Sequence, residues 1–399
     1  MPRLLFINRV FPPTPGATGQ LLWELTADLA RRGHEVTVLA ARAPEGTTES
    51  RPSGVKVVRY GGASGKRTGL ASKAVGYARQ YPSLAWRLRG MSPMDGWVSM
   101  TDPPLQAVAV AALKPVGTRL IHWAQDVYPE VAEELGVLRR GGAAAGVCRR
   151  LAISALRRHD RVVAVGRCMA TRLHTRDPDR PRPDVIPNWA PLPEPRADDD
   201  ERRQAFRASL APTGARVVMY SGNFGRAHPF EAIADAVRAT AAANPPIHWA
   251  FIGEGPKFPW MREAVGACPH TRFLPSQPWA DLRVTLSAAD LHLASMEDTV
   301  VGTVVPSKVY GALAVGRPCL LLGPAAGEAA QLICDTGAGW VMEKASGDRL
   351  AAELVRSLGD HGVWTSLQSA AAAAVSEVSR ERCLERWADV IGTTLSRPQ

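Results

Sequence analysis

The sequence predicts an α/β protein built from two Rossmann-like, doubly wound domains, each a parallel sheet covered by helices on both faces. Three observations lead to this prediction. Strand-like and helix-like segments alternate along the whole chain, which is typical of parallel sheets. The chain has 399 residues, too many for one typical core. A proline-rich stretch followed by acids, at positions 187–201, interrupts the alternation near its middle.

In the first half, short apolar runs predict strands and longer amphipathic runs predict helices. The expected strands are Leu4–Asn8, Glu35–Ala40, Val55–Tyr60, Gly96–Met100, Arg119–Ala124, Arg161–Val165 and Asp184–Ile186. The expected helices are Gln20–Arg32, Ser72–Arg89, Leu105–Leu113 and Ala143–Arg158. These elements predict an N-terminal domain over residues 1–190.

The same alternation restarts after the interruption. The expected strands are Arg216–Ser221, Trp249–Gly253, Thr271–Leu274, Leu291–Ser295, Pro318–Leu322 and Gly339–Met342. The expected helices are Pro229–Ala243, Trp279–Ala288, Pro306–Val315, Gly327–Cys334 and Asp348–Leu358. We expect a C-terminal domain over residues 191–379, and within residues 380–399 a last helix, Arg380–Leu395, that packs back toward the first domain. Two such domains are expected to face each other across a cleft.

The bulk composition limits the class of protein. The net charge of +10 comes mainly from arginines scattered along the chain, which favours phosphorylated ligands, a polyanion or an anionic membrane surface. No basic, aromatic-rich motif is concentrated enough to predict nucleic-acid binding. The six cysteines show no Cys-x-x-Cys spacing, so no zinc site is expected. No run of 18 apolar residues predicts a membrane span, and a cytoplasmic location is expected.

The run Val304–Pro318 contains the most informative local pattern. Pro306, Ser307 and Lys308 open an apolar helix, where free backbone N–H groups and a cationic side chain favour an anion. The alternative is an ordinary helix start in an α/β domain.

Glycine-rich turns follow the strands of the second half. Gly222, Asn223 and Arg226 join one strand to a helix, and an amide with a guanidinium suits a diphosphate. Gly253 and Glu254 follow the next strand in a Gly-x-Gly turn, which is weak evidence because such turns are common. The third strand ends at Leu274, where backbone groups suit a flat heterocyclic base.

Two loops of the first half carry candidate residues. His122, Gln125 and Asp126 stand at or just past the end of a central strand, where Asp126 suits a base, a ligand of an acceptor hydroxyl or a stabiliser of positive charge. The alternative is that Asp126 caps a turn and His122 is a core residue. Gly16 and Gly19 precede a long helix and allow the backbone to approach an anion, although a plain turn explains them as well.

Taken together, these loops resemble a bacterial family 4 glycosyltransferase of GT-B fold over nearly the whole chain. The resemblance rests on the Pro-Pro-x-x-Gly loop and on the segments 32–38, 186–189, 220–223, 253–255 and 306–308. Gln125-Asp126 followed by an aromatic residue, Pro129 and an acid is similar to the branch that builds O-antigen, capsule and colanic-acid-like polysaccharides.

The resemblance implies a nucleotide-sugar donor in the C-terminal domain, an acceptor in the N-terminal one, retention of anomeric configuration and no cofactor or required metal. The diphosphate would be held by Arg226, Ser307 and Lys308. Many members carry two glutamates eight positions apart, and the alignment places Thr303 and Gly311 there. Glu297 or Asp298, in the preceding loop, then becomes a candidate for the donor sugar.

Alternatives remain open at this point. A sugar-nucleotide epimerase of the same fold would cleave the donor without an acceptor, and a non-catalytic partner subunit would need neither glutamate. The acceptor is a sugar, a lipid-linked glycan or a natural product. The segment Lys73–Arg89 mixes bases with Tyr, Trp and Leu, which fits peripheral contact with an anionic membrane at the inner face of the cell membrane or an ordinary solvated helix.

Overall fold

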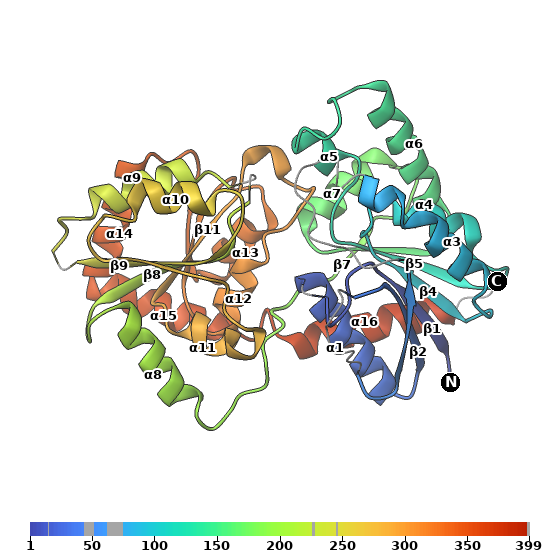
Figure 1. The fold of residues 1–399 in the computed structure, drawn as a ribbon, viewed down its shortest axis with the longest axis horizontal. Helices are drawn as coiled ribbons and strands as arrows, with labels where there is room; N and C mark the ends of the chain where they lie inside the picture. Colours follow the sequence, from blue (N-terminus) through green and yellow to red (C-terminus); the bar gives the residue numbers. More distant parts are fainter. Residues whose placement is uncertain (15, 44–51, 62–74, 226–227, 245, 397–399) are drawn as a thin grey trace. The chain divides into compact units, whose positions relative to one another are not determined.

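The chain folds into two compact units, each a parallel sheet with helices on both faces, which confirms the predicted α/β class (Figure 1). The computed structural model describes residues 1–14, 16–43, 52–61, 75–225, 228–244 and 246–396. Unit 1 comprises Met1–Pro191, Gly302–Val305 and Glu381–Gln399, and unit 2 comprises Leu192–Val301 and Pro306–Arg380. The short piece Gly302–Val305 therefore belongs to unit 1, although its flanks belong to unit 2.

Unit 1 contains a seven-stranded sheet in the order β3-β2-β1-β4-β5-β6-β7. The strands are β1 (Arg3–Ile7), β2 (Glu35–Ala41), β3 (Val55–Tyr60), β4 (Gly96–Ser99), β5 (Arg119–Ala124), β6 (Arg161–Ala164) and β7 (Asp184–Val185). All neighbours pair in parallel. The winding direction reverses between β1 and β4, and ligands of such sheets bind where the strands end beside that reversal.

Two sets of helices cover this sheet. The helices are α1 (Ala17–Arg31), α3 (Tyr81–Arg89), α4 (Gln106–Leu113), α5 (Glu130–Glu134), α6 (Ala143–Arg157), α7 (Arg167–Arg176) and α16 (Arg380–Leu395). Side chains of α1, α7 and α16 share one buried cluster, whereas those of α3, α4 and α6 share another. The two clusters contain alternate residues of the same strands, as the two-residue period of a strand requires.

Unit 2 contains a six-stranded parallel sheet in the order β10-β9-β8-β11-β12-β13. Its strands are β8 (Arg216–Asn223), β9 (Ile247–Glu254), β10 (Thr271–Leu274), β11 (Leu291–Ser295), β12 (Cys319–Leu322) and β13 (Gly339–Met342). Its helices are α8 (Asp199–Leu210), α9 (Phe230–Ala239), α10 (Phe258–Val265), α11 (Leu282–Ser287), α12 (Lys308–Ala314), α13 (Glu328–Thr336), α14 (Gly347–Gly359) and α15 (His361–Ala374), with 3-10 turns at Trp279–Asp281 and Asp298–Val300. Helices α9, α10 and α14 pack on one face of the sheet, and α8 packs on the other.

The predicted helices differ from the observed ones in two informative places. The predicted helix over Ser72–Arg89 is interrupted in its described part: residues 75–78 are helical, a turn follows at 79–80, and α3 begins at Tyr81 with Pro82 in its first turn. Residues 62–74 lie outside the described residues. The predicted helix Pro306–Val315 is shorter in the structure, because α12 begins at Lys308 and ends at Ala314.

The C-terminal helix α16 supplies part of the unit 1 core. Trp387 is fully buried, and its ring centroid lies 4.6 Å from that of Trp123 on β5. Trp123 in turn stacks on Trp189 at a centroid distance of 6.2 Å. Three indoles therefore join the central strand, the end of the first unit and the last helix. Aromatic pairs of this kind add to the stability that burial alone provides.

Trp387→Ala is expected to destabilise unit 1 by about 3–5 kcal/mol, because truncating a buried tryptophan loses apolar burial and leaves a cavity. The measurement is the midpoint of thermal unfolding by scanning calorimetry. Glu385→Ala, at an exposed position of the same helix, is the matched control and should change the midpoint little. Equal midpoints for the two variants would show that α16 does not contribute to the core.

Candidate active site

The strand ends of unit 2 bring several predicted donor residues to one edge of the sheet. Asn223 and Glu254 are the last residues of β8 and β9, and both are exposed. Leu274 ends β10, and Glu297 follows β11; both are half-buried. Because parallel strands all end at the same edge, these side chains gather there although they are far apart in the chain.

Lys308 is the cation at this edge. Its Nζ lies 4.9 Å from the centroid of the Tyr220 ring and 3.5 Å from the carbonyl oxygen of Asn223. In the described part of the chain no carboxylate lies within ion-pair distance of Lys308, whereas Lys257 nearby pairs with Glu231 at 3.3 Å. Burial lowers the pKa of Lys308 to about 8. The charge of Lys308 is thus available for an anion that the chain itself does not supply.

Gly222 leaves room for this lysine. A Cβ on Gly222 would lie 3.0 Å from Cε of Lys308, tighter than ordinary contacts. On the facing strand, a Cβ on Gly253 would lie only 2.0 Å from the carbonyl oxygen of Gly222. These two glycines therefore allow β8, β9 and the aliphatic part of Lys308 to pack closely. The sequence pattern alone is equally compatible with this packing role and with ligand binding.

His228 lies near the same group, and its imidazole belongs to the loop that the sequence predicted for a diphosphate. Its Nδ1 lies 2.6 Å from the carbonyl oxygen of Ser295, and its ring packs edge-on against Tyr220. Burial, with the nearby Lys308 charge, lowers the pKa of His228 to about 4, so the imidazole is neutral at physiological pH. The sequence of the loop after β8 did not show that the His228 ring would pack against Tyr220 and bond to Ser295.

The remaining donor predictions have different positions. Ser307 is exposed and directly precedes α12, which has only seven residues, so Lys308 rather than the helix end dominates the local charge. Arg226 lies outside the described residues. Thr303 is fully buried in the unit 1 segment, where its carbonyl oxygen accepts a hydrogen bond from the N–H of Val127 at 2.9 Å.

In unit 1 the end of β5 carries the predicted residues His122, Gln125 and Asp126. The Gln125 side-chain amide exchanges two hydrogen bonds with that of Asn188, at 3.1 and 2.7 Å, and both residues are buried. The backbone N–H groups of Gln125 and Asp126 both donate to the Thr101 hydroxyl, at 2.9 and 3.4 Å. Gln125 therefore holds the loop in place, and its amide is already engaged.

Asp126 has the most perturbed carboxyl group of this loop. Burial, with a smaller contribution from the charge of Asp102, raises the pKa of Asp126 to about 7. Asp126 and His122 line a narrow cavity together with Thr101, Tyr128 and Arg176. A carboxyl that titrates near neutral pH suits proton transfer with a hydroxyl group.

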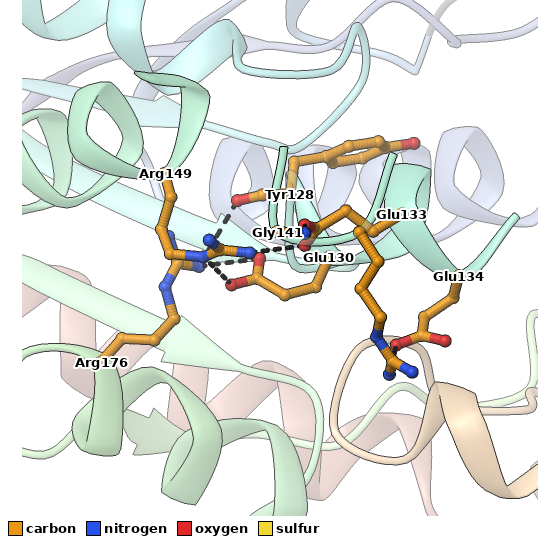
Figure 2. Close-up of polar contacts among 8 residues, drawn as sticks. Tyr128, Glu130, Glu133, Glu134, Gly141, Arg149 and Arg176 are labelled. Carbon is orange, nitrogen blue, oxygen red and sulfur yellow. Dashed lines mark hydrogen bonds and ion pairs between the residues drawn. The ribbon is translucent and has the colours of Figure 1, made fainter. Parts of the chain in front are cut away.

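A cluster of four charged side chains, two buried glutamates and two half-buried arginines, holds the chain just after Asp126 (Figure 2). Arg149 on α6 contacts Glu130 at 3.1 Å and Glu133 at 2.5 Å, both on α5. Arg176 on α7 contacts the second oxygen of Glu130 and the backbone carbonyl of Tyr128, each at 3.4 Å. The i,i+3 spacing of the two glutamates was the only sequence signal for this cluster, since the arginines come from distant helices.

The predicted phosphate loop at Gly16 and Gly19 packs against its own chain. A Cβ on either glycine would lie 2.9 Å from Cγ1 of Val10, so both residues permit close contact between the start of α1 and the end of β1. Helix α1 has 15 residues and no side-chain cap. The glycines are thus explained by packing, and ligand binding there stays a prediction.

The family comparison decides the class of protein. Residues 16–189 match the family described as "Glycosyl transferase 4-like domain", and residues 215–360 match "Glycosyl transferases group 1". The chain belongs to the glycosyltransferases. The transferase has the GT-B architecture that its resemblance implied, with one matched family on the main part of each unit.

Individual relatives agree with this assignment. The transferase is 29% identical over 253 residues to the probable glycosyltransferase WbjE of Pseudomonas aeruginosa, covering 62% of each chain. It is 26% identical over 226 residues to the putative colanic acid biosynthesis glycosyl transferase WcaI of Escherichia coli, covering 55% of this chain and 54% of that one. The chain thus spans less than two thirds of the length of either relative.

Solved structures share the fold. Sucrose-phosphate synthase from Thermosynechococcus elongatus superimposes with a TM-score of 0.73 at 14% identity, covering 98% of this chain and 99% of that one. Anabaena HepE in complex with UDP-glucose superimposes with a TM-score of 0.68 at 15% identity, covering 98% and 100%. At these identities the likeness shows the fold of the transferase alone.

The raised pKa of Asp126 predicts how its removal changes stability. The pKa is about 7 in the folded protein against an ordinary value of 3.8, so the carboxyl favours the folded state when it is protonated. That contribution is fully present below pH 3.8 and is lost as the pH rises through about 7. We expect Asp126→Asn to unfold at a higher temperature than the wild type at pH 8, with a smaller difference at pH 5.

Scanning calorimetry at the two pH values measures this difference. Asp389→Asn, at an exposed position of α16, is the control and should show the same small effect at both. A pH-independent effect of Asp126→Asn would contradict the raised pKa.

Proposed function

We propose that the transferase moves a sugar from a nucleoside-diphosphate sugar held by unit 2 to a hydroxyl group of an acceptor held by unit 1. The observation that best supports this proposal is Lys308, a half-buried cation at the strand ends of unit 2 for which the described residues supply no carboxylate partner. A partly buried cation without an internal counter-charge is favourable only if a ligand supplies the anion. A diphosphate does so.

The charge change in the reaction explains why such a lysine matters. The bond between the anomeric carbon and the diphosphate oxygen breaks, the bond to the acceptor oxygen forms, and negative charge accumulates on the leaving diphosphate. A fixed cation beside that oxygen stabilises the transition state more than the ground state. Binding of the anion also raises the pKa of Lys308 from about 8, so the lysine is fully charged when the donor is present.

The other donor assignments use residues at this edge of the sheet together with Arg226, which lies outside the described residues. We assign Ser307, Asn223 and Arg226 to the diphosphate, and Glu254, Leu274 and Glu297 to the base and sugar. HepE, which shares the fold, binds UDP-glucose, so uridine diphosphate is the first nucleotide to test. Retention of anomeric configuration is part of the proposal, and the anomeric proton coupling in the product distinguishes it from inversion.

On the acceptor side, we assign Asp126 to the reacting hydroxyl group. A carboxyl group with a pKa of about 7 accepts a proton from the attacking hydroxyl and returns it to solvent near neutral pH. Both curated relatives are described as glycosyltransferases, and WcaI as one of colanic acid biosynthesis. A glycan or lipid-linked glycan is therefore the acceptor class that we favour.

We also propose that catalysis needs no metal ion, because Lys308 supplies the positive charge that a metal would otherwise bring to the diphosphate. Within the described ranges, no three His, Cys, Asp or Glu side chains gather to bind a metal. Turnover in the presence of EDTA tests this part of the proposal.

The donor site predicts a nucleotide-dependent stabilisation. We expect UDP or another nucleoside diphosphate to raise the unfolding temperature, and Lys308→Ala to abolish the shift, because ligands stabilise the state that binds them. With a sugar donor and acceptor, the same change is expected to lower kcat/KM by roughly 10²–10³-fold, as for loss of one stabilising donor. Lys56→Ala, at an exposed position of β3, is the control.

A response of Lys308→Ala to UDP equal to that of the wild type would contradict the assignment of the diphosphate site. No response of the wild type to any nucleoside diphosphate would contradict the proposed transfer as a whole.

Peripheral membrane contact is a further part of the proposal. Helix α3 buries Leu84 and Leu88, while Trp86 is 67% exposed with the Arg87 guanidinium 4.9 Å from its ring centroid. Arg89 extends the basic character of this face. No helix in the described part of the chain is long and apolar enough to cross a bilayer. An exposed indole among arginines suits the surface of an anionic membrane.

Flotation with vesicles tests this contact. We expect the protein to float with phosphatidylglycerol vesicles at low salt but not with phosphatidylcholine vesicles, and Trp86→Ala to weaken flotation. Trp260→Ala, on the exposed side of α10 in unit 2, is the matched control. Absence of flotation at low salt would remove the membrane proposal and leave the transfer proposal unaffected.

A further inference from the structure

Three buried polar side chains form a continuous hydrogen-bonded chain inside unit 1. Nδ1 of His122 on β5 lies 2.9 Å from Oγ of Ser99 on β4, and that oxygen lies 3.1 Å from Nε2 of His159. Nδ1 of His159 lies 2.8 Å from the backbone carbonyl oxygen of Ala155 on α6. His122, Ser99 and His159 are all buried, and the proposed transfer uses neither Ser99 nor His159.

The direction of every hydrogen bond follows from the carbonyl end. A carbonyl oxygen only accepts, so His159 carries its proton on Nδ1. Burial, with the neighbouring His122, lowers the pKa of His159 well below its ordinary value, so the ring is neutral and its Nε2 has no proton. Nε2 of His159 therefore accepts from the Ser99 hydroxyl.

The same reasoning fixes the tautomer of His122. The Ser99 hydroxyl donates its single proton to Nε2 of His159. Ser99 Oγ must therefore accept its other hydrogen bond, from Nδ1–H of His122. Burial lowers the pKa of His122 to about 4, and this ring is also neutral at physiological pH. Its Nε2 consequently carries a lone pair and no proton, and in the described part of the chain no other group forms a hydrogen bond with that atom.

The ring of His122 lines the same cavity as Asp126. His122 and Ala124 lie on one face of β5, as the two-residue period of a strand requires, and Asp126 follows just past the strand end; all three line the cavity. The free space inside is about 40 Å³. That space holds about two or three water-sized groups, which fits a hydroxyl or hydroxymethyl group but not a sugar ring.

We propose that the Ser99–His159 chain holds His122 as the Nδ1–H tautomer, so that Nε2 accepts a hydrogen bond from an acceptor hydroxyl group entering the cavity beside Asp126. The ligand class is a neutral hydrogen-bond donor. Ser99 and His159 are positioning residues, because they act through His122. The identity of the hydroxyl rests on the proposed function, whereas the tautomer does not.

Nitrogen-15 NMR of the histidine side chains tests the tautomer directly. With ¹⁵N-labelled histidine and long-range ¹H–¹⁵N correlations, His122 and His159 are both expected to show a protonated Nδ1 and an unprotonated Nε2. Ser99→Ala is expected to shift His122 toward the Nε2–H form, and Ser99→Thr, which restores the hydroxyl, should return it. Ser154→Ala, at an exposed position of α6, is the control and should change neither ring.

His159→Asn provides a second break in the chain without altering Ser99, in case Ser99→Thr does not fold. An Nε2–H tautomer for His122 in the wild type would overturn the proposal. So would a His122 signal in Ser99→Ala that is identical to the wild type.

Kinetics test the ligand. Ser99→Ala is expected to raise the KM for the acceptor about tenfold, the usual effect of losing one hydrogen bond, and to leave stabilisation by UDP unchanged. An unchanged acceptor KM would overturn the assignment of the cavity to the hydroxyl. If the wild type binds no nucleotide, the proposed function is refuted. The tautomer of His122 is tested by NMR independently of that result.

Discussion

Every candidate reacting group in this protein depends on one constraint, that all strands of a parallel sheet end at the same edge. The ends of β8 and β9 bring Asn223 and Glu254 together, and Lys308 reaches the same edge from the start of α12, 85 positions after Asn223. The end of β5 places Asp126 next to Thr101, which follows β4. Each sheet therefore gathers at its edge candidate residues that are far apart in the sequence. The loops after the strands need only be short, because the strand ends already lie side by side.

The loop that carries Asp126 is held by polar contacts as well as by the apolar packing of the buried Val127. Arg149 and Arg176 together balance Glu130 and Glu133, so the cluster carries no net charge. Removing one member would leave an unpaired buried charge, which is strongly destabilising, although the intact set is not in itself a strong source of stability. Such an arrangement favours one conformation of the loop. The amide pair of Gln125 and Asn188 acts in the same direction from the other side.

How far the sequence predicted this structure depends on the range of the interactions. Strands and long helices follow from local periodicity, and the bounds of α16 match those expected because its buried side chains repeat at helical spacing. Position at a strand end predicted His122 and Asp126 together, and the structure places both on the wall of one cavity. The partner of Gln125 and the relay through Ser99 join residues about sixty positions apart, and such pairs leave no periodic signal. No helix was predicted at α5, and the predicted helix at α12 was too long. One or two helical turns contain too few positions to show a period in the sequence.

Burial acts in opposite directions on the two principal ionisable groups. It raises the pKa of Asp126 to about 7 and lowers that of Lys308 to about 8, so both are driven toward their neutral forms. Neither group has an opposite charge from the described residues in direct contact to reverse the effect. In the proposed function a bound diphosphate supplies that charge to Lys308, so donor binding and protonation of the lysine would reinforce each other. For Asp126 no anion can help, and in the proposed site a neutral hydroxyl oriented by His122 would leave the carboxyl free to take up a proton near pH 7. Under this proposal, the same physical effect prepares one unit to bind an anion and the other to accept a proton.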